Sequence, residues 1–378
     1  MTIEDGGVTG PCWVLAECPL PPSERSRYLS IVPDGATPAL PYVLGNRFRP
    51  AAGGRVYRVV TDDDDCPDSL LRSPDGRYLM YGSSRGGWPV LDVLDLRTGA
   101  RFTWRARACD PAWGRDGQIA YVHFVSFNAN SGGVERVVVQ HGLDGTPRAW
   151  TRLGSWAGPV WAGNDLLAND GAGLFVLYGP GREEAVDGDR SELGLSVVAL
   201  SPHGTEALLD AQRLGPGGGG EGSEDLATLL RVDDDRVLSS LVISRNESGP
   251  VAALAPGGDW QGDEVVTTDG YFSGGAMSPP PVLVTLTVTG GRVRERSIRL
   301  FVERGYSQVG GQDKAEVSQA TFLDASGRHV AMWLGAIGQL RYVACDTITG
   351  NCSASWNYGD PYSGPGANGG FVSNPSRP

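Results

Sequence analysis

A run of acidic residues in the first quarter of the chain could bind a cation. It consists of Asp62, Asp63, Asp64, Asp65 and Asp68. Hard cations such as Ca²⁺ prefer several carboxylate oxygens, although the spacing here does not match an EF-hand loop. The alternative interpretation is a solvated acidic loop. We therefore treat the run, together with Asp110, as a candidate ligand-binding group. The sequence predicts no cofactor, and the identity of any metal stays open.

Catalytic chemistry has fewer candidates. A lyase or hydrolase site would require two or more of His123, His203, His329, Asp68 and Asp110 to meet with perturbed pKa values. The chain has four histidines in all, and these three lie far apart in the sequence. The segment from Gly82 to Gly86 matches G-x-S-x-G, but a nucleophile elbow needs a strand-to-helix turn, and here two strands flank it. We therefore assign no catalytic residue.

Six cysteines, Cys12, Cys18, Cys66, Cys109, Cys345 and Cys352, allow fifteen pairings. Cys345 and Cys352 flank a turn and could face each other across a hairpin. Cys66 and Cys109 each precede the first strand of a strand group, and Cys12 and Cys18 are close in sequence. Free thiols in a cytoplasmic protein are the alternative to these three pairs. No C-x-x-C spacing is present, so we expect no zinc site.

Composition limits the class of partner. The 378 residues carry a formal net charge of −12, without basic clusters, which argues against nucleic acid and anionic membrane surfaces. No apolar run is long enough for a transmembrane helix. The first residues lack a basic region and a long apolar segment, which predicts a cytoplasmic protein; export is the alternative if translation starts further upstream. We expect a monomer that binds a protein or a small ligand.

The elements that would position these residues are short antiparallel strands. The stretch from Ser73 to Gly99 has turns at Pro74–Gly76, Ser83–Gly87 and Arg97–Gly99, separated by alternating strands. Glycine tolerates the positive φ that tight turns need. With one strand before and one after, this stretch forms four strands in about 40 residues, the pattern of one β-propeller blade.

The same alternation of short strands and turns continues along the chain. It predicts an all-β, seven-bladed propeller over residues 1–358, with a disordered tail at 359–378. Six blades remain an alternative if the first segment only adds strands that close the ring. The predicted blades extend from Cys12 to Thr61, Ser69 to Arg105, Cys109 to Thr151, Pro159 to Val186, Ser196 to Ile243, Val251 to Phe301 and Val317 to Trp356. Within the first, the predicted strands are Cys12–Glu17, Tyr28–Val32, Leu40–Leu44 and Arg55–Thr61.

The best-formed repeat resembles the TolB-type, WD40-like (PD40) propeller repeat. The residues that carry the resemblance are Ser73–Gly76, Ser84–Gly86 and Leu96–Gly99, with partial copies at Arg115–Gly117, Ser201–Gly204 and Thr347–Gly350. The resemblance implies the fold but no catalytic residue, because the matching motif is a structural turn.

Topology then suggests where a ligand would bind. The connections between blades and the loops between second and third strands lie at one face of a propeller. Here that face would carry Asp62–Asp65, Asp110, Asp187, Asp189, Glu192 and the loops 128–133, 215–225 and 271–281. Long loops on a rigid scaffold commonly carry binding. We therefore expect a non-catalytic scaffold that binds through this loop-rich acidic face; the alternative is a lyase or hydrolase at the central channel.

Overall fold

A computed structural model describes most of the chain, with gaps. The described residues are 2–4, 7–9, 28–33, 35–36, 38, 40–44, 47–50, 55–59, 70–114, 116–128, 132–170, 173–186, 192–213, 224–234, 236–245, 254, 257–268, 282–303, 316–336, 339–355 and 370–371. All regular elements among these residues are strands. Within those ranges, no helix of sufficient length and apolar character to traverse a membrane is found.

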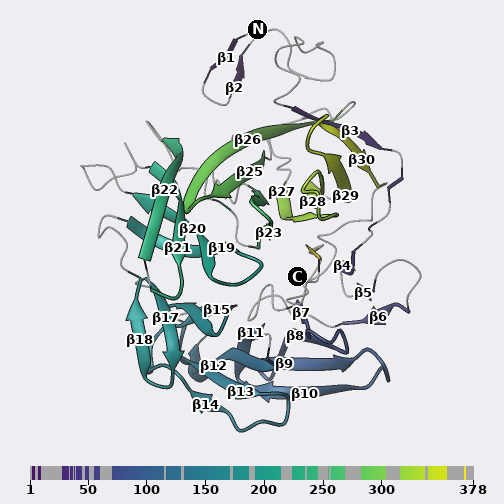
Figure 1. Cartoon of the computed structure of the whole chain (residues 1–378). Helices are drawn as coiled ribbons and strands as arrows, with labels where there is room; N and C mark the ends of the chain where they lie inside the picture. The colour runs from purple at the N-terminus through teal and green to yellow at the C-terminus, as the bar shows by residue number, and fades with distance from the viewer. Residues whose placement is uncertain are drawn as a thin grey trace.

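Seven four-stranded antiparallel blades follow one another around a ring (Figure 1). Blade 2 consists of β7 (Leu70–Arg72), β8 (Tyr78–Arg85), β9 (Trp88–Asp95) and β10 (Arg101–Ala106), and blade 3 of β11 (Ala108–Trp113), β12 (Gln118–Asn128), β13 (Gly132–His141) and β14 (Arg148–Ala149). Blade 4 consists of β15 (Ala157–Ala162), β16 (Asp165–Asn169), β17 (Leu174–Gly179) and β18 (Arg182–Ala185), and blade 5 of β19 (Glu192–Leu200), β20 (Glu206–Arg213), β21 (Glu224–Arg231) and β22 (Arg236–Arg245). Blade 6 consists of β23 (Asp259–Gln261), β24 (Glu264–Thr268), β25 (Val282–Thr289) and β26 (Arg292–Glu303), and blade 7 of β27 (Glu316–Phe322), β28 (His329–Ala336), β29 (Gln339–Asp346) and β30 (Asn351–Ala354).

Blade 1 is built from both ends of the described chain. Its strands are β4 (Tyr42–Leu44), β5 (Arg47–Arg49) and β6 (Tyr57–Arg58), and the last strand of the chain, β31 (Gly370–Phe371), pairs antiparallel with β4. β31 thus takes the place that the first strand of the blade holds elsewhere. Two residues of the segment predicted as a disordered tail therefore form a strand, and the rest of that segment lies outside the described residues.

Two strands of the predicted first blade belong to blade 1, Leu40–Leu44 as β4 and Arg55–Thr61 as β6, whereas β5 was not predicted. The segment predicted as Tyr28–Val32 is β3 (Tyr28–Pro33), which lies parallel to β26 on one side and to β30 on the other (Figure 1). It joins blades 6 and 7 into a nine-stranded sheet by covering the outer edge of each. The predicted strand at Cys12–Glu17 lies outside the described residues, and β1 (Thr2–Glu4) with β2 (Gly7–Thr9) forms a separate hairpin.

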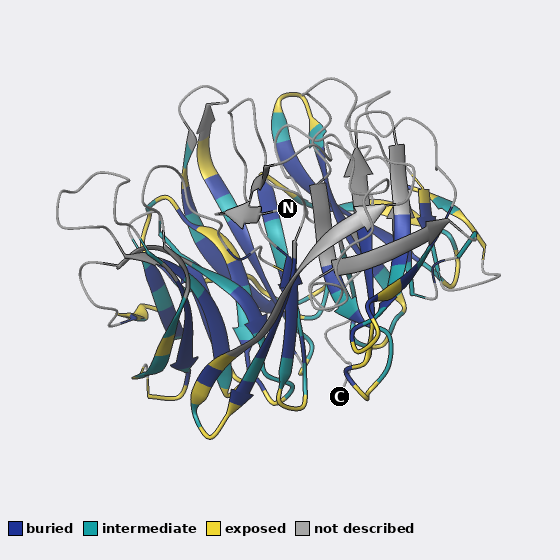
Figure 2. Cartoon of the chain, turned by 90° about the horizontal axis from the view of Figure 1, so that it is seen from above, coloured by how far each residue is buried: buried dark blue, intermediate teal, exposed yellow. Residues whose placement is uncertain are grey.

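The core lies between the blades, in apolar clusters that each span one pair of neighbours. The larger cluster between blades 2 and 3 centres on Trp104, Trp113 and Tyr121. Blades 2 and 3 share a second, smaller cluster of Cys109, Val122 and Phe124, with Trp88 packed against it. The ring closes where Tyr42 of blade 1 meets Trp333 of blade 7, with ring centroids 5.4 Å apart. The remaining five clusters lie between the other neighbours. Seven interfaces confirm the seven-bladed prediction. Figure 2 shows buried strands ending in exposed turns.

The hydrogen bonds of the turn Ser73–Arg77 show why the Ser-Pro-Asp-Gly motif directly precedes the second strand of a blade. The hydroxyl of Ser73 accepts a hydrogen bond from the amide of Tyr78 at 2.8 Å and donates to Asp75 at 2.6 Å. Asp75 in turn accepts the amide of Arg77 at 3.0 Å. Gly76 has φ +69°, a left-handed conformation that favours glycine. Each polar group of the turn is thus satisfied locally, which fixes where the strand starts.

Candidate functional site

Most of the predicted acidic site lies outside the described residues. This applies to Asp62–Asp65, Asp68, Asp187 and Asp189, and to the side chain of Glu192. Asp110 is described. It adopts φ +47° in a bulge of β11, and its carboxylate accepts the amide of Gly158 on β15 at 3.4 Å. Asp110 therefore helps to join the inner strands of blades 3 and 4.

The catalytic alternative would need the histidines to converge, and the described ones lie on different blades. His123 lies on blade 3, His203 in a turn of blade 5 and His329 on blade 7. Burial, together with the charges of Arg136 and Arg107, lowers the pKa of His123. Within the described ranges, no group of three or more histidine, cysteine or acidic side chains could hold a metal ion.

One buried acid, Glu135, also has a perturbed pKa, raised by burial and by the nearby charge of Asp110. It does not act with His123. Glu135 pairs with Phe124 across β12 and β13, whereas His123 pairs with Arg136. Directly opposed residues share a face of a sheet, and successive residues alternate between faces. The two perturbed groups therefore lie on opposite faces of blade 3.

The G-x-S-x-G match is part of a hairpin. Ser84 pairs with Pro89 in the β8–β9 ladder, so the strand-to-helix turn of a nucleophile elbow is not formed. The neighbouring Ser83 donates to the buried carboxylate of Asp92 at 3.0 Å, which also accepts from Arg85 at 3.0 Å. These side chains stabilise the blade.

Cys345 and Cys352 are directly opposed in the β29–β30 ladder and form a disulfide, with an S–S distance of 2.03 Å. Cys109 is also disulfide-bonded. Cys12, Cys18 and Cys66 lie outside the described residues. None of the cysteines in the described ranges is free.

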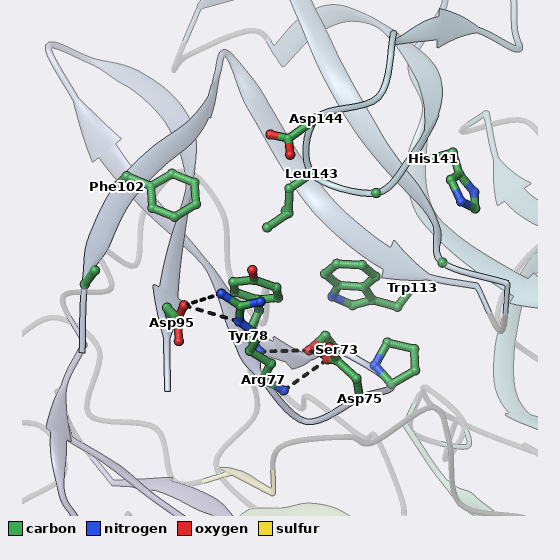
Figure 3. Close-up of a pocket in the computed structure, with 14 residues that line it drawn as sticks. Ser73, Asp75, Arg77, Tyr78, Asp95, Phe102, Trp113, His141, Leu143 and Asp144 are labelled. Atoms are coloured by element: carbon green, nitrogen blue, oxygen red, sulfur yellow. Dashed lines mark hydrogen bonds and ion pairs between the residues drawn. The ribbon is translucent and has the colours of Figure 1, made fainter. Parts of the chain in front are cut away.

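A pocket of about 630 Å³ opens between blades 2 and 3 (Figure 3). It lies at the turns that join first to second and third to fourth strands, which is the opposite face from the predicted acidic one. Its lining residues are Ser73, Pro74, Asp75, Arg77, Tyr78, Asp95, Ala100, Phe102, Trp113, Gly117, His141, Gly142, Leu143 and Asp144.

The blade 2 wall carries an ion pair between two turns. Arg77 donates to Asp95 at 3.0 Å, and its guanidinium lies over the ring of Tyr78, 4.7 Å from the centroid. Burial alone would raise the pKa of Asp95, but the hydrogen bonds from Arg77 and from the amides of Thr98 and Arg97 lower it. The only guanidinium that lines the pocket is therefore already paired.

The blade 3 wall lacks the corresponding pair. In blades 2 and 7, the carbonyls of Arg77 and Arg328 accept the amide that follows the third strand. In blade 3 the carbonyl of Gly117 does so, accepting from Gly142. His141 takes the strand-end place of Asp95, because each pairs with the first residue of its neighbouring strand. Blade 3 thus presents a glycine and an imidazole where blade 2 has an arginine and a carboxylate.

The loop that carries Asp144 is held by blades 2 and 3 together. The Gln140 side chain donates to the carbonyls of Gly142 and Leu143 at 2.7 and 3.1 Å. Trp104 of blade 2 donates to the same Leu143 carbonyl at 2.8 Å. Asp144 itself is exposed and pairs with no described residue. A fixed loop therefore presents a free carboxylate at the pocket.

Trp113 contributes an unpaired donor to this pocket. The residue is 8% exposed, and no described residue accepts a hydrogen bond from its buried Nε1. Figure 3 shows the nitrogen edge of its indole turned toward Tyr78. Four other described tryptophans donate this hydrogen to a backbone carbonyl, namely Trp104, Trp156, Trp161 and Trp260.

Sequence reasoning missed this pocket, since it placed the binding face at the other end of the strands. A signal was present in the repeats. Aligning the turns by their strand ends sets Gly117 against Arg77 and Arg328, and His141 against Asp95 and Asp346. Blade 3 thus departs from the two most regular turns at both positions that line the pocket.

No family model matches the chain, and no curated protein matches it. Solved structures do. TolB from Acinetobacter baumannii is 16% identical, with 69% of this chain and 65% of that chain covered and a TM-score of 0.42. The β-propeller domain of the trilobed protease from Pyrococcus furiosus is 12% identical, with 76% and 82% covered and a TM-score of 0.45. A xyloglucanase from Xanthomonas campestris is 11% identical, with 86% and 54% covered and a TM-score of 0.53.

The chain is a seven-bladed β-propeller. At these identities the likeness shows the fold alone. The seven blades of the structure confirm the fold that the repeat resemblance implies. The chain spans less than two thirds of TolB and about half of the xyloglucanase. An acylaminoacyl peptidase and an oligogalacturonate lyase are also among the similar structures.

Proposed function

We propose that the chain is a binding propeller that holds a ligand in the pocket between blades 2 and 3 without transforming it. The observation that carries the proposal is the buried, unpaired indole N–H of Trp113. A buried donor without an acceptor costs about 1–3 kcal/mol. The Nε1 atom has almost no exposed surface in the ligand-free protein, so the ligand that supplies its acceptor would reach it only with a shift of the lining side chains.

Catalysis at the central channel is the competing function. It would need an acid and a base directed at one point. The described groups with the most suitable shifts, His123 and Glu135, lie on opposite faces of one blade. Among the pocket residues, the Ser73 hydroxyl donates to the Asp75 carboxylate, but both groups also accept amides of their own turn, which supports a structural role. These points favour binding.

The test compares two equivalent tryptophans. Trp113→Phe removes a donor that has no partner, so in the ligand-free protein the free energy of unfolding should fall only by the packing lost with the smaller ring. Trp161→Phe removes a donor that reaches the Ala112 carbonyl at 3.2 Å, so it should lower that free energy by about 1 kcal/mol more. Urea denaturation of both variants measures the difference.

Binding is then measured by a thermal-shift screen against sugars, peptides, nucleotides and divalent cations. A ligand of the folded state raises the Tm with the logarithm of its concentration over Kd. At least one compound should shift the wild-type protein and Trp161→Phe, but not Trp113→Phe. The proposal fails if no compound shifts the wild type, or if every shift persists in Trp113→Phe.

The acidic face remains a separate prediction. Of its carboxylates, Asp110 has a described partner in Gly158, which supports a structural role at that position. The thermal-shift screen covers this face as well. A rise in Tm with a divalent cation that EDTA abolishes, and that Trp113→Phe still shows, would assign a metal to the Asp62–Asp65 run.

We further propose that the protein works in an oxidising compartment, which is the export alternative. What supports this is the disulfide between Cys345 and Cys352 and the disulfide-bonded state of Cys109. Titrating free thiols in the denatured, unreduced protein tests it. If all six thiols react in protein purified from its native host, the cysteines are free and the cytoplasmic alternative is supported instead.

A further inference from the structure

We infer that the ligand of the blade 2–blade 3 pocket is a neutral saccharide. The inference rests on the proposed function and adds the chemical class of ligand. It follows from which donors, acceptors and charges of the pocket are already paired and which are free.

Anionic ligands are disfavoured by the charges of the lining. Three carboxylates, Asp75, Asp95 and Asp144, face one guanidinium, that of Arg77. Two nitrogens of Arg77 are hydrogen-bonded to Asp95, at 3.3 and 3.0 Å. No unpaired guanidinium or ammonium group among the lining residues is left for a phosphate or carboxylate. The chain as a whole is also acidic, with a net charge of −12.

A simple cation does not fit either. Asp144 would attract an ammonium group, but such a group brings no acceptor for the N–H of Trp113. The ligand needs groups that both accept and donate. A hydroxyl does both: it accepts from Trp113 and donates to a carboxylate such as Asp144.

The other free groups suit a sugar. The hydroxyl of Tyr78 pairs with no described residue, and Figure 3 shows it pointing toward Phe102 and Leu143. Phe102 is 44% exposed, so its ring offers an apolar surface for the C–H face of a pyranose. Aromatic surface with a few fixed polar groups is typical of small-ligand pockets.

A peptide backbone would be recognised differently. Extended peptides bind by adding a strand to a sheet edge. Most of this rim consists of the turns around Ser73–Arg77, Asp95–Ala100 and Gly142–Asp144. Few unpaired backbone groups of a strand are therefore presented, and side chains make the contacts. The pocket volume of about 630 Å³ also leaves room for more than one sugar ring.

The experiment probes the full chain on an array of neutral, anionic and amino glycans, and measures the best hits by isothermal titration calorimetry. Neutral glycans should bind. Tyr78→Phe and Phe102→Ala should each weaken binding at least fivefold, and Trp113→Phe at least tenfold. Ile348→Ala is the matched control, because it truncates an apolar side chain that is 62% exposed on a blade 7 turn; it should leave the affinity unchanged.

Circular dichroism melts establish that each variant folds before its affinity is compared. If only anionic glycans, amines or short peptides bind, and the pocket variants weaken that binding, the saccharide assignment is wrong while the binding function stands. If neutral glycans bind with equal affinity to all variants, the pocket is not their site. If nothing binds in any class, both proposals fail.

Discussion

Gly204 and Gly163 meet backbone to backbone between the turns of blades 5 and 4. A Cβ on Gly204 would lie 2.2 Å from the amide nitrogen of Gly163, closer than any real contact allows. Gly204 also has φ +70°. The partial repeat motif Ser201–Gly204 therefore keeps its glycine for two reasons, a left-handed turn and the close approach of a neighbouring blade.

The first prediction uses this contact. Gly204→Ala should destabilise the protein by about 3 kcal/mol or more, because backbone strain of about 1–2 kcal/mol adds to a clash that no side-chain movement relieves. Gly86→Ala is the matched control. Gly86 has φ +62°, but a Cβ added there would have no atom within 4 Å, so only the strain should appear. Equal losses in urea denaturation would show that the close approach does not matter.

The second prediction concerns acid stability. The hydrogen bond from Arg328, helped by the amides of Ile348 and Thr349, lowers the pKa of Asp346 although partial burial opposes it. A carboxyl whose folded pKa lies below its unfolded value of about 3.9 stabilises the protein above that value, and the contribution is lost as the pH falls through the folded pKa. Asp346→Asn should therefore cost about 1 kcal/mol at pH 7 and progressively less below pH 4.

Asp263→Asn is the control for this measurement, because Asp263 is exposed and its side chain pairs with no described residue. It should leave the unfolding free energy unchanged across the same pH range. A cost of Asp346→Asn that stays constant down to pH 2 would mean that the ion pair with Arg328 adds nothing.

The third prediction concerns the disulfide in blade 7. Cys345 and Cys352 are buried in the cluster between blades 6 and 7, at 1% and 3% exposure. The bond closes a short loop, for which the chain-entropy account gives about 2–3 kcal/mol. Either Cys345→Ala or Cys352→Ala alone should produce most of that loss, and the double variant little more, because each single change already removes the bond. Additive losses in thermal melts would indicate two independent side chains instead.

Much of this fold could be predicted because its turns are local. The hydrogen bonds of Ser73, Asp75 and Gly76 all lie within six residues, so the motif determines the turn wherever it occurs. The alternation of strands and turns that follows from such local motifs predicts seven blades, and the seven interfaces between neighbouring blades agree with it.

The errors lie where pairing is long-range. β3 joins residues that are about 270 and 320 positions away in sequence, Leu300 and Asn351, and nothing in its own residues specifies those partners. β31 has only two residues, too few for a pattern. The pocket was missed for a related reason, since it depends on how the turns of two blades face each other.

The last prediction tests the role of β3. The backbone of Ser30 lies between Val302 of β26 and Asn351 of β30, within two parallel ladders. Ser30→Pro removes the amide donor and should weaken the pairing of β3 with its neighbouring strands. The free energy of unfolding should fall by about 1 kcal/mol for each hydrogen bond lost. Exposed edges pair with other chains, so the variant should also form dimers or larger species in size-exclusion chromatography with light scattering. Ser30→Ala keeps the backbone donor and should show the stability and size of the wild-type protein. If Ser30→Pro keeps the wild-type stability and size, β3 does not protect the edges of blades 6 and 7.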